Sequence, residues 1–334
     1  MSLRDRVGKR EAQHGVGLNS CKTPLLLICW RRPHTLSKVI DAIRPLAPSN
    51  IFVACDGADV KRIGEMDKVA ATRAVIDREI DWPCVVHKLY ADTNLGCSVG
   101  PIRAITWFFE NVEEGIILED DCVPHPDFFD YSRTLLERYR HDERVWCISG
   151  NNFQNGRWRG DGSYYFSCYT HTWGWSSWRR CWEQYDVDLT LWPTLRSSTL
   201  LRTIFEDDVE RQYWSEIWDS THLRTVPVTW WDYQWAFLCQ TNGGLTALPN
   251  RNLVSNVGFG TDATHTTISA EPTKVDGGLG QLIHPRFVLR DTEADRYTFD
   301  HHFGGMSRRL SGKLASRIRH RLSRYWKQLQ TSSD

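Results

Sequence analysis

The sequence lacks the features that mark several common classes of protein. No apolar run among its 334 residues approaches the roughly 20 that a membrane-spanning helix needs. Residues 1–22 are polar, mix basic and acidic side chains, and contain no apolar signal core. We therefore expect a disordered leader over 1–22, in a protein that stays in the cytoplasm.

Cysteine motifs and nucleic-acid signatures are also missing. The ten cysteines form no C-x-x-C pair and no Cys/His spacing typical of zinc, so they are expected to be reduced core residues. The N-x-[ST] glycosylation acceptor does not occur. Basic and acidic residues balance at 41 each, and between Trp146 and Trp235 the only basic cluster among the aromatic residues is Arg179-Arg180. No nucleic-acid partner is expected.

Charge is nevertheless unevenly distributed along the chain. Eight basic residues and no acid lie between Met306 and Gln330. Apolar residues recur there at every fourth position, which predicts a helix with one apolar stripe and basic faces: Leu310, Leu314, Ile318, Leu322 and Trp326. A basic amphipathic helix over 306–330 suits an anionic membrane surface, which would make the protein peripheral at the inner face. Packing of this helix on the rest of the protein is the alternative.

Apolar strands alternate with helical patterns through the first 150 residues. The patterns predict strands over 25–30, 51–55, 85–89, 115–118 and 145–149. Helices are predicted from about 35, over 65–80, over 99–113 and over 128–140. Repeated βαβ units predict an α/β fold with a mostly parallel sheet flanked by helices.

Charged residues follow three of these strands directly. Arg31-Arg32-Pro33 follows the first strand, Asp56-Gly57 the second, and Glu119-Asp120-Asp121 the fourth. In such sheets, ligands bind beyond the carboxyl ends of the strands. Neither G-x-G-x-x-G after the first strand nor a G-x-x-x-x-G-K-[ST] loop is present, so any phosphate must be held in another way.

The acidic triplet carries the most specific chemistry. Three consecutive carboxylates at the end of a buried strand repel one another unless a cation or hydrogen-bond donors compensate. Mg²⁺ or Mn²⁺ binds one or two carboxylates and completes its shell with substrate phosphates and water. A solvated acidic turn or helix cap before Pro124 is the alternative.

These motifs occur in the order found in GT-A glycosyltransferases. Asn94-Leu95-Gly96, Gly174-Trp175 and Trp231-Asp232 extend the series begun by Arg32, Asp56 and the triplet. Over roughly residues 24–270, the chain resembles the inverting N-acetylglucosaminyltransferase I type and bacterial sugar transferases. The resemblance implies a GT-A domain over 23–300, with a nucleotide-sugar half to about 150 and an acceptor half after it.

The resemblance also implies a role for each matching residue. Asp121 matches the ligand of a Mn²⁺ or Mg²⁺ cofactor, and Asp232 the general base. The segment 255–265 matches a loop that closes over the donor diphosphate. The implied donor-binding residues are Arg32, Asp56, Arg103, Glu119, Asp120, Thr264 and His265.

The 16 tryptophans fit a carbohydrate ligand. Apolar C–H faces of sugar rings stack on aromatic side chains, and indole can still donate a hydrogen bond. About three quarters of the tryptophans are expected in the core. Trp175, Trp230 and Trp231 are the candidates for contact with an acceptor.

The expected activity is a metal-dependent inverting transfer. A hexosyl or N-acetylhexosaminyl group would move from a nucleotide-diphosphate sugar to a hydroxyl of a glycan or glycolipid, with one base and one metal site. A sugar nucleotidyltransferase is an alternative, but it needs a glycine-rich loop where Arg31-Arg32-Pro33 stands. A non-catalytic carbohydrate-binding protein is another, and retention of both Asp121 and Asp232 argues against it.

Overall fold

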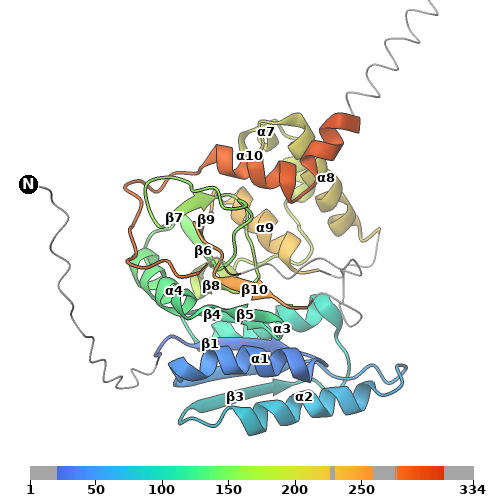
Figure 1. Ribbon diagram of the computed structural model, residues 1–334. Coiled ribbons are helices and arrows are strands. Elements are labelled where there is room, and N and C mark those ends of the chain that lie inside the picture. The colour runs from blue at the N-terminus through green and yellow to red at the C-terminus, as the bar shows by residue number, and fades with distance from the viewer. Residues whose placement is uncertain (1–20, 226–229, 259–274, 276, 312–334) are drawn as a thin grey trace, which may run out of the picture.

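An eight-stranded mixed sheet organises the protein. The computed structural model describes residues 21–225, 230–258, 275 and 277–311. The strands lie in the order β3-β2-β1-β4-β8-β6-β9-β7, with helices packed against the sheet (Figure 1). Only β7 and β8 run against the other strands of this sheet. The predicted α/β class, with a mostly parallel sheet flanked by helices, is confirmed.

The first half of the sheet is parallel and follows the sequence prediction closely. It contains β1 (Leu25–Cys29), β2 (Asn50–Cys55), β3 (Val85–Tyr90) and β4 (Glu114–Glu119). Strands β1, β2 and β4 are apolar along nearly their whole length, as parallel strands covered on both faces must be.

Helices connect these parallel strands. They are α1 (Pro33–Ile43), α2 (Glu65–Glu79) and α3 (Gly96–Asn111), and a 3₁₀ turn at Arg44–Leu46 follows α1. Pro33 begins α1, where its missing N–H costs nothing and its fixed φ suits the helix. The apolar face of α1 is buried against the sheet.

The second half of the sheet is less regular. Strand β6 (Val145–Ser149) was predicted, but β7 (Tyr164–Ser167), β8 (Trp175–Trp178) and β9 (Leu245–Pro249) were not. Strand β8 inserts between β4 and β6 and is antiparallel to both. Its sequence, Trp-Ser-Ser-Trp, is too short and too polar to show a strand pattern. Both halves of the chain thus contribute strands to one sheet.

A small antiparallel ribbon lies beside the acidic triplet. Strand β5 (Cys122–Pro124) pairs with β10 (Val254–Asn256), and Asn256 lies opposite Cys122. The backbone N–H of Val257 then donates to the carbonyl of Asp121 at 2.8 Å. The ribbon therefore brings residues 254–258 to the end of β4 across more than a hundred residues of sequence.

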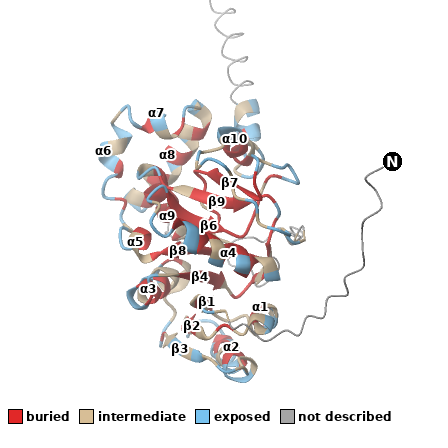
Figure 2. Cartoon of the chain, turned by 90° about the vertical axis from the view of Figure 1, so that its left-hand side faces the viewer, coloured by how far each residue is buried: buried red, intermediate tan, exposed pale blue. Residues whose placement is uncertain are grey.

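Further helices accompany the second half of the sheet. They are α4 (Pro126–Tyr139), α5 (Arg179–Trp182), α6 (Trp192–Arg196), α7 (Leu201–Ile204), α8 (Asp208–Leu223), α9 (Asp232–Thr241) and α10 (Thr292–His301). Burial is concentrated on the strands and on the inner faces of these helices (Figure 2). Nine of the 15 tryptophans in the described ranges are buried, which accounts for much of the tryptophan content by packing.

The ends of the chain are described only in part. Of the predicted leader, residues 1–20 lie outside the described residues, as does 312–330 of the predicted basic helix. Residues 305–311 are helical, and Arg309 joins Asp207 at 2.6 Å and Asp300 at 2.8 Å. Arg308 pairs with Glu216 at 2.9 Å. Among the residues described, no helix combines the length and apolar character needed to cross a membrane.

Candidate functional site

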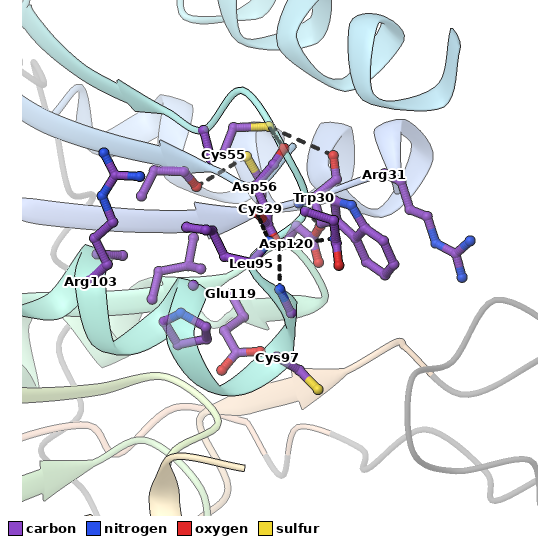
Figure 3. Close-up of a pocket in the computed structure, with 18 of the residues that line it drawn as sticks. Cys29, Trp30, Arg31, Cys55, Asp56, Leu95, Cys97, Arg103, Glu119 and Asp120 are labelled. Carbon is purple, nitrogen blue, oxygen red and sulfur yellow. Dashed lines mark hydrogen bonds between the residues drawn. The ribbon is translucent and has the colours of Figure 1, made fainter. Parts of the chain in front are cut away.

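A cavity of about 400 Å³ opens at the carboxyl ends of β1, β2 and β4 (Figure 3). Its apolar lining comes from these strands and from the turn and helix around α3. Five predicted donor-binding residues line it together: Arg32, Asp56, Arg103, Glu119 and Asp120. They meet because parallel strands deliver their following turns to one edge of the sheet.

Arg32 connects the first strand to the acidic triplet. Its two terminal nitrogens contact Asp120 Oδ1 at 2.5 Å and Asp121 Oδ2 at 2.6 Å. The backbone N–H of Trp30 donates to the other oxygen of Asp120 at 3.0 Å. Both carboxylates are largely buried. The sequence placed Arg32 at the donor; the structure shows that Arg32 also supplies the positive charge nearest the triplet.

Burial and the repulsion between neighbouring carboxylates disfavour ionisation of Glu119 and Asp120. Burial is the main cause that raises the pKa of Glu119 to about 8, and the charge of Asp121 adds to it. Burial likewise raises the pKa of Asp120 to about 6, against the opposing effect of Arg32. The same carboxylates raise the pKa of Arg32 further above its usual value. One guanidinium thus compensates only part of the charge of three carboxyls.

The triplet can hold a hard divalent ion. In the described part of the chain, no three His, Cys, Asp or Glu side chains are grouped to ligate a metal on their own. Mg²⁺ and Mn²⁺ sites at phosphates often use one or two carboxylates, the rest of the shell being phosphate oxygen and water. The oxygen ligands and the residual negative charge of the triplet fit this kind of site.

The segment after β10 packs directly on Asp121. The N–H of Gly258 donates to Asn256 Oδ1 at 2.8 Å. A Cβ atom on Gly258 would lie 2.1 Å from Asp121 Oδ2, so only glycine permits this approach. The predicted 255–265 loop thus begins at the acidic triplet. Thr264 and His265 lie outside the described residues.

Asp56 organises the opposite wall of the cavity. Its carboxylate accepts hydrogen bonds from the backbone of Gly57 and Leu95, both at 2.8 Å, and of Gly96 at 3.0 Å. The side-chain amide of Asn94 donates to it at 3.1 Å. Burial nevertheless raises its pKa. In this conformation, Asp56 fixes the turn that leads into α3, a contribution that the sequence did not reveal.

Trp30 is a cavity residue that sequence reasoning missed. Its indole N–H donates to the carbonyl of Gly57 at 2.9 Å, and the guanidinium of Arg31 lies 4.3 Å from the ring centre. Arg31 is in turn paired with Glu65 at 2.9 Å and lies at one edge of the group of side chains drawn, beside Trp30 (Figure 3). The available signal was position, because Trp30 directly precedes the two arginines at the end of the first strand.

Asp232 lies in the second half of the chain, and its relation to the acidic triplet is electrostatic. It is the first residue of α9, where the helix dipole favours an ionised carboxylate. Its charge is among the causes that raise the pKa of Glu119, so the two carboxyls lie within electrostatic range. Residues 226–229, which precede this segment, lie outside the described residues.

The three candidate acceptor-contact tryptophans differ in exposure. Trp175 and Trp231 are only 1% and 5% exposed, and their rings stack with centroids 5.6 Å apart. Trp230 is half-buried and meets the ring of Tyr233 edge-on. In this conformation, the first two rings belong to the core, and only Trp230 offers appreciable surface to a ligand.

Comparisons with known proteins give remote structural likenesses. No family model matches the chain, and no curated protein is similar to it in sequence. The 4-diphosphocytidyl-2C-methyl-D-erythritol synthase of Anaerococcus prevotii aligns over 57% of this chain and 86% of its own, with 10% identity and a TM-score of 0.31. The UTP-bound UGPase of Acinetobacter baumannii aligns over 68% and 85%, with 6% identity and a TM-score of 0.32. Similarities this distant assign no family or activity.

Proposed function

We propose that the protein is a metal-dependent inverting glycosyltransferase. It transfers a hexosyl or N-acetylhexosaminyl group from a nucleotide-diphosphate sugar to a hydroxyl of a glycan or glycolipid. The observation that carries the proposal is that Arg32, Glu119 and Asp120 line one cavity, while Arg32 also contacts Asp121. Asp232 lies within electrostatic range of Glu119. A glycosyltransferase of this kind needs donor-binding residues, a metal ligand and a general base near one another.

The cavity provides groups suited to a nucleotide sugar. Its apolar lining can cover a base, while Asp120 and Glu119 can hydrogen-bond to ribose and sugar hydroxyls. Arg103 stands exposed on α3 at the cavity wall, where a guanidinium can contact phosphate. Thr264 and His265 complete the proposed donor contacts.

Asp121 is the proposed ligand of Mn²⁺ or Mg²⁺. When bound, the ion neutralises charge on the departing nucleotide diphosphate. Arg32 holds the Asp121 carboxylate in place at 2.6 Å, and the close backbone of Gly258 restricts its movement. These contacts orient the carboxylate toward one arrangement before ligands arrive.

Asp232 is the proposed general base. It removes the proton from the acceptor hydroxyl as that oxygen attacks the anomeric carbon. It is the first residue of α9, and a helix amino terminus stabilises nearby negative charge. Trp230 offers its ring to the apolar face of the acceptor sugar, while Trp175 and Trp231 support that wall from the core.

We also propose that the basic segment 306–330 binds an anionic membrane surface, at its cytoplasmic face. Arg308 and Arg309 are already paired with Glu216, Asp207 and Asp300. Six further basic residues follow them in the sequence up to Gln330. This arrangement lets the first turn dock on the domain while the later charges face lipid.

The decisive experiment measures the products from a panel of nucleotide sugars, with and without glycan acceptors. The expected result is release of a nucleoside diphosphate together with glycosylation of the acceptor, dependent on Mn²⁺ or Mg²⁺. Asp121→Ala should abolish the activity while leaving the folded structure intact. The matched control is Asp130→Ala, which removes a carboxylate that is 86% exposed on α4.

Other outcomes would replace this function by a different one. Formation of pyrophosphate from a nucleoside triphosphate and a sugar phosphate would indicate a sugar nucleotidyltransferase. Acceptor binding without turnover would indicate a carbohydrate-binding protein. Full activity in EDTA would contradict the metal site.

A further inference from the structure

Two cysteines lie side by side at the base of the cavity. Cys29 ends β1 and Cys55 ends β2, and the two are direct register partners in the parallel pairing. Both line the cavity. Figure 3 shows Cys29 and Cys55 close to each other, and Cys97 at a distance from both. All ten cysteines of the chain are free thiols.

The parallel register places the two thiols next to each other. Their closeness, together with burial, raises the pKa of Cys29, and it lowers the pKa of Cys55. Each thiol also lies near a backbone carbonyl, Cys29 Sγ at 3.6 Å from Ala54 and Cys55 Sγ at 3.7 Å from Trp30. Neighbouring strands are about 4.8 Å apart, within the Cα separation of about 4.4–6.8 Å that a disulfide spans.

Arg73 distinguishes Cys55 from its partner. The Arg73 guanidinium donates to the carbonyl of Ala91 at 2.7 Å, and its buried Nε has no acceptor. Its charge and a hydrogen bond from its side chain help to lower the pKa of Cys55. A nearby cation of this kind favours the thiolate, which is the reactive form. Cys55 is therefore the thiol that is oxidised first, and Cys29 is placed to attack the oxidised Cys55 and form the disulfide.

We infer that Cys29 and Cys55 form a reversible disulfide under peroxide, and that this bond closes the cavity to nucleotides. The second half of the inference rests on the proposed donor site. Cross-links between directly opposed residues on neighbouring strands are strained, and strained disulfides are the readily reduced ones.

The chemistry balances with hydrogen peroxide as the oxidant. The Cys55 thiolate attacks one peroxide oxygen, an S–O bond forms, the O–O bond breaks, and hydroxide leaves. The Cys29 thiol then attacks the sulfenic sulfur, the S–S bond forms and the S–O bond breaks, and the departing hydroxide takes the Cys29 proton and leaves as water. An external dithiol returns both residues to thiols by exchange.

The position of the pair explains why the link would affect ligand binding. The backbone N–H of Asp56 donates to the carbonyl of Cys29 at 3.0 Å, so the two strand ends are already joined there. Trp30, Arg31 and Arg32 follow Cys29 directly, and Asp56 follows Cys55. Drawing the sulfurs into a covalent bond twists both turns that shape the cavity.

The first arm of the test maps disulfides in the full-length protein. After brief treatment with hydrogen peroxide, intact mass should fall by one pair of hydrogens, and non-reducing peptide mapping should join Cys29 to Cys55. Cys55→Ser and Cys29→Ser should prevent this. Cys147→Ser should not, because Cys147 is a buried strand cysteine that does not line the cavity. A disulfide to Cys97, or no disulfide, would overturn the inference.

The second arm measures binding of uridine and guanosine diphosphates by calorimetry. Oxidation should weaken binding about tenfold or more, and dithiothreitol should restore it. The Cys55→Ser protein should keep its affinity under peroxide. A mapped disulfide with unchanged affinity would overturn the closing of the cavity. If the reduced protein binds neither nucleotide, the proposed donor site fails, while disulfide mapping still decides the thiol pair.

Discussion

The two halves of this molecule, which we propose bind the nucleotide and the acceptor, contribute to the candidate site in different ways. In the first half, each parallel strand ends in a polar turn, so Arg32, Asp56 and Asp121 follow strands one after another. In the second half, strands are short, one is inserted antiparallel, and the first residue of α9, Asp232, lies within electrostatic range of Glu119. Because the first half has a regular topology, its site residues can be predicted from the sequence. The second half is packed irregularly, so the position of its site residue cannot.

The two halves also differ in how they are packed. The larger apolar cluster covers the parallel strands and their helices and continues into the second half through β6 to β9 and α9. A second, smaller cluster lies among α6, α7, α8, α9 and α10 and is dominated by aromatic rings. Most tryptophans in the acceptor half therefore serve packing. A high tryptophan content does not by itself identify a sugar-binding surface.

The largest expected effect concerns the aromatic core. Trp218 is fully buried, with its ring centroid 5.1 Å from those of both Trp192 and Phe237. Trp218→Ala should lower the free energy of unfolding by about 3–5 kcal/mol because it leaves a large cavity. Chemical denaturation measures this, with the exposed Trp158→Ala as the control. A loss below about 1 kcal/mol would mean that the second cluster adds little to the fold.

The next effect tests the acceptor half directly. Asp232→Asn should lower turnover at least about 10²-fold with little change in nucleotide-sugar affinity, because the base faces the acceptor hydroxyl. Steady-state kinetics and donor binding separate the two quantities. Asp208→Asn is the matched control, since Asp208 likewise begins a helix and is exposed. Weakened donor binding with normal turnover at saturation would reassign Asp232 to the nucleotide half.

A buried carboxyl in the aromatic core should make stability depend on pH. Tyr169 donates a hydrogen bond to Glu210, but burial dominates and raises the Glu210 pKa from 4.5 to about 7. The folded protein then binds this proton more tightly than the unfolded chain. The stabilisation of the folded protein by the protonated Glu210 carboxyl is complete below about pH 4.5 and is lost as the pH rises through about 7.

Glu210→Gln removes this titration. The variant should match the parent at pH 5 and exceed its unfolding free energy on the order of 2 kcal/mol at pH 8.5. Denaturation at several pH values measures the difference. Glu206→Gln, at an exposed position of the same half, serves as the control. A difference that does not vary with pH would show that Glu210 is ionised in the folded protein.

A smaller effect tests the junction of the two halves. Gly258→Ala should lower the apparent affinity for Mn²⁺ about tenfold, because the added Cβ displaces Asp121, which the metal site needs. Gly100→Ala is the control, since its Cβ would find ordinary contact distances near 3.6 Å. Activity titrated with Mn²⁺ reports the change. An unchanged titration would place the metal away from Asp121.

The smallest effect on catalysis is expected from the tail. Truncation after Ser311 keeps the Arg308 and Arg309 ion pairs and should leave turnover on a water-soluble acceptor unchanged. The full-length protein should sediment with anionic vesicles and be released as salt shortens the Debye length below about 10 Å. The truncated protein should remain in the supernatant. Sedimentation of both proteins alike would show that the tail does not carry membrane binding.

The sequence by itself determined the α/β class, the five strands β1, β2, β3, β4 and β6, and the turns that follow β1, β2 and β4. It could do so because a buried parallel strand must be apolar along its length, and the residues after it must face the same edge of the sheet. The same local logic predicted α1 from its apolar spacing and from Pro33 at its start.

Tertiary structure alone decided how these residues are used. It paired Arg32 with Asp120 and Asp121, assigned the Asp56 carboxylate to backbone amides, and set Cys29 against Cys55. It also buried Trp175 and Trp231 while leaving Trp230 partly exposed. Such outcomes depend on contacts between residues far apart in the chain. Desolvation and packing in three dimensions decide which of these contacts form, and no local sequence pattern records them.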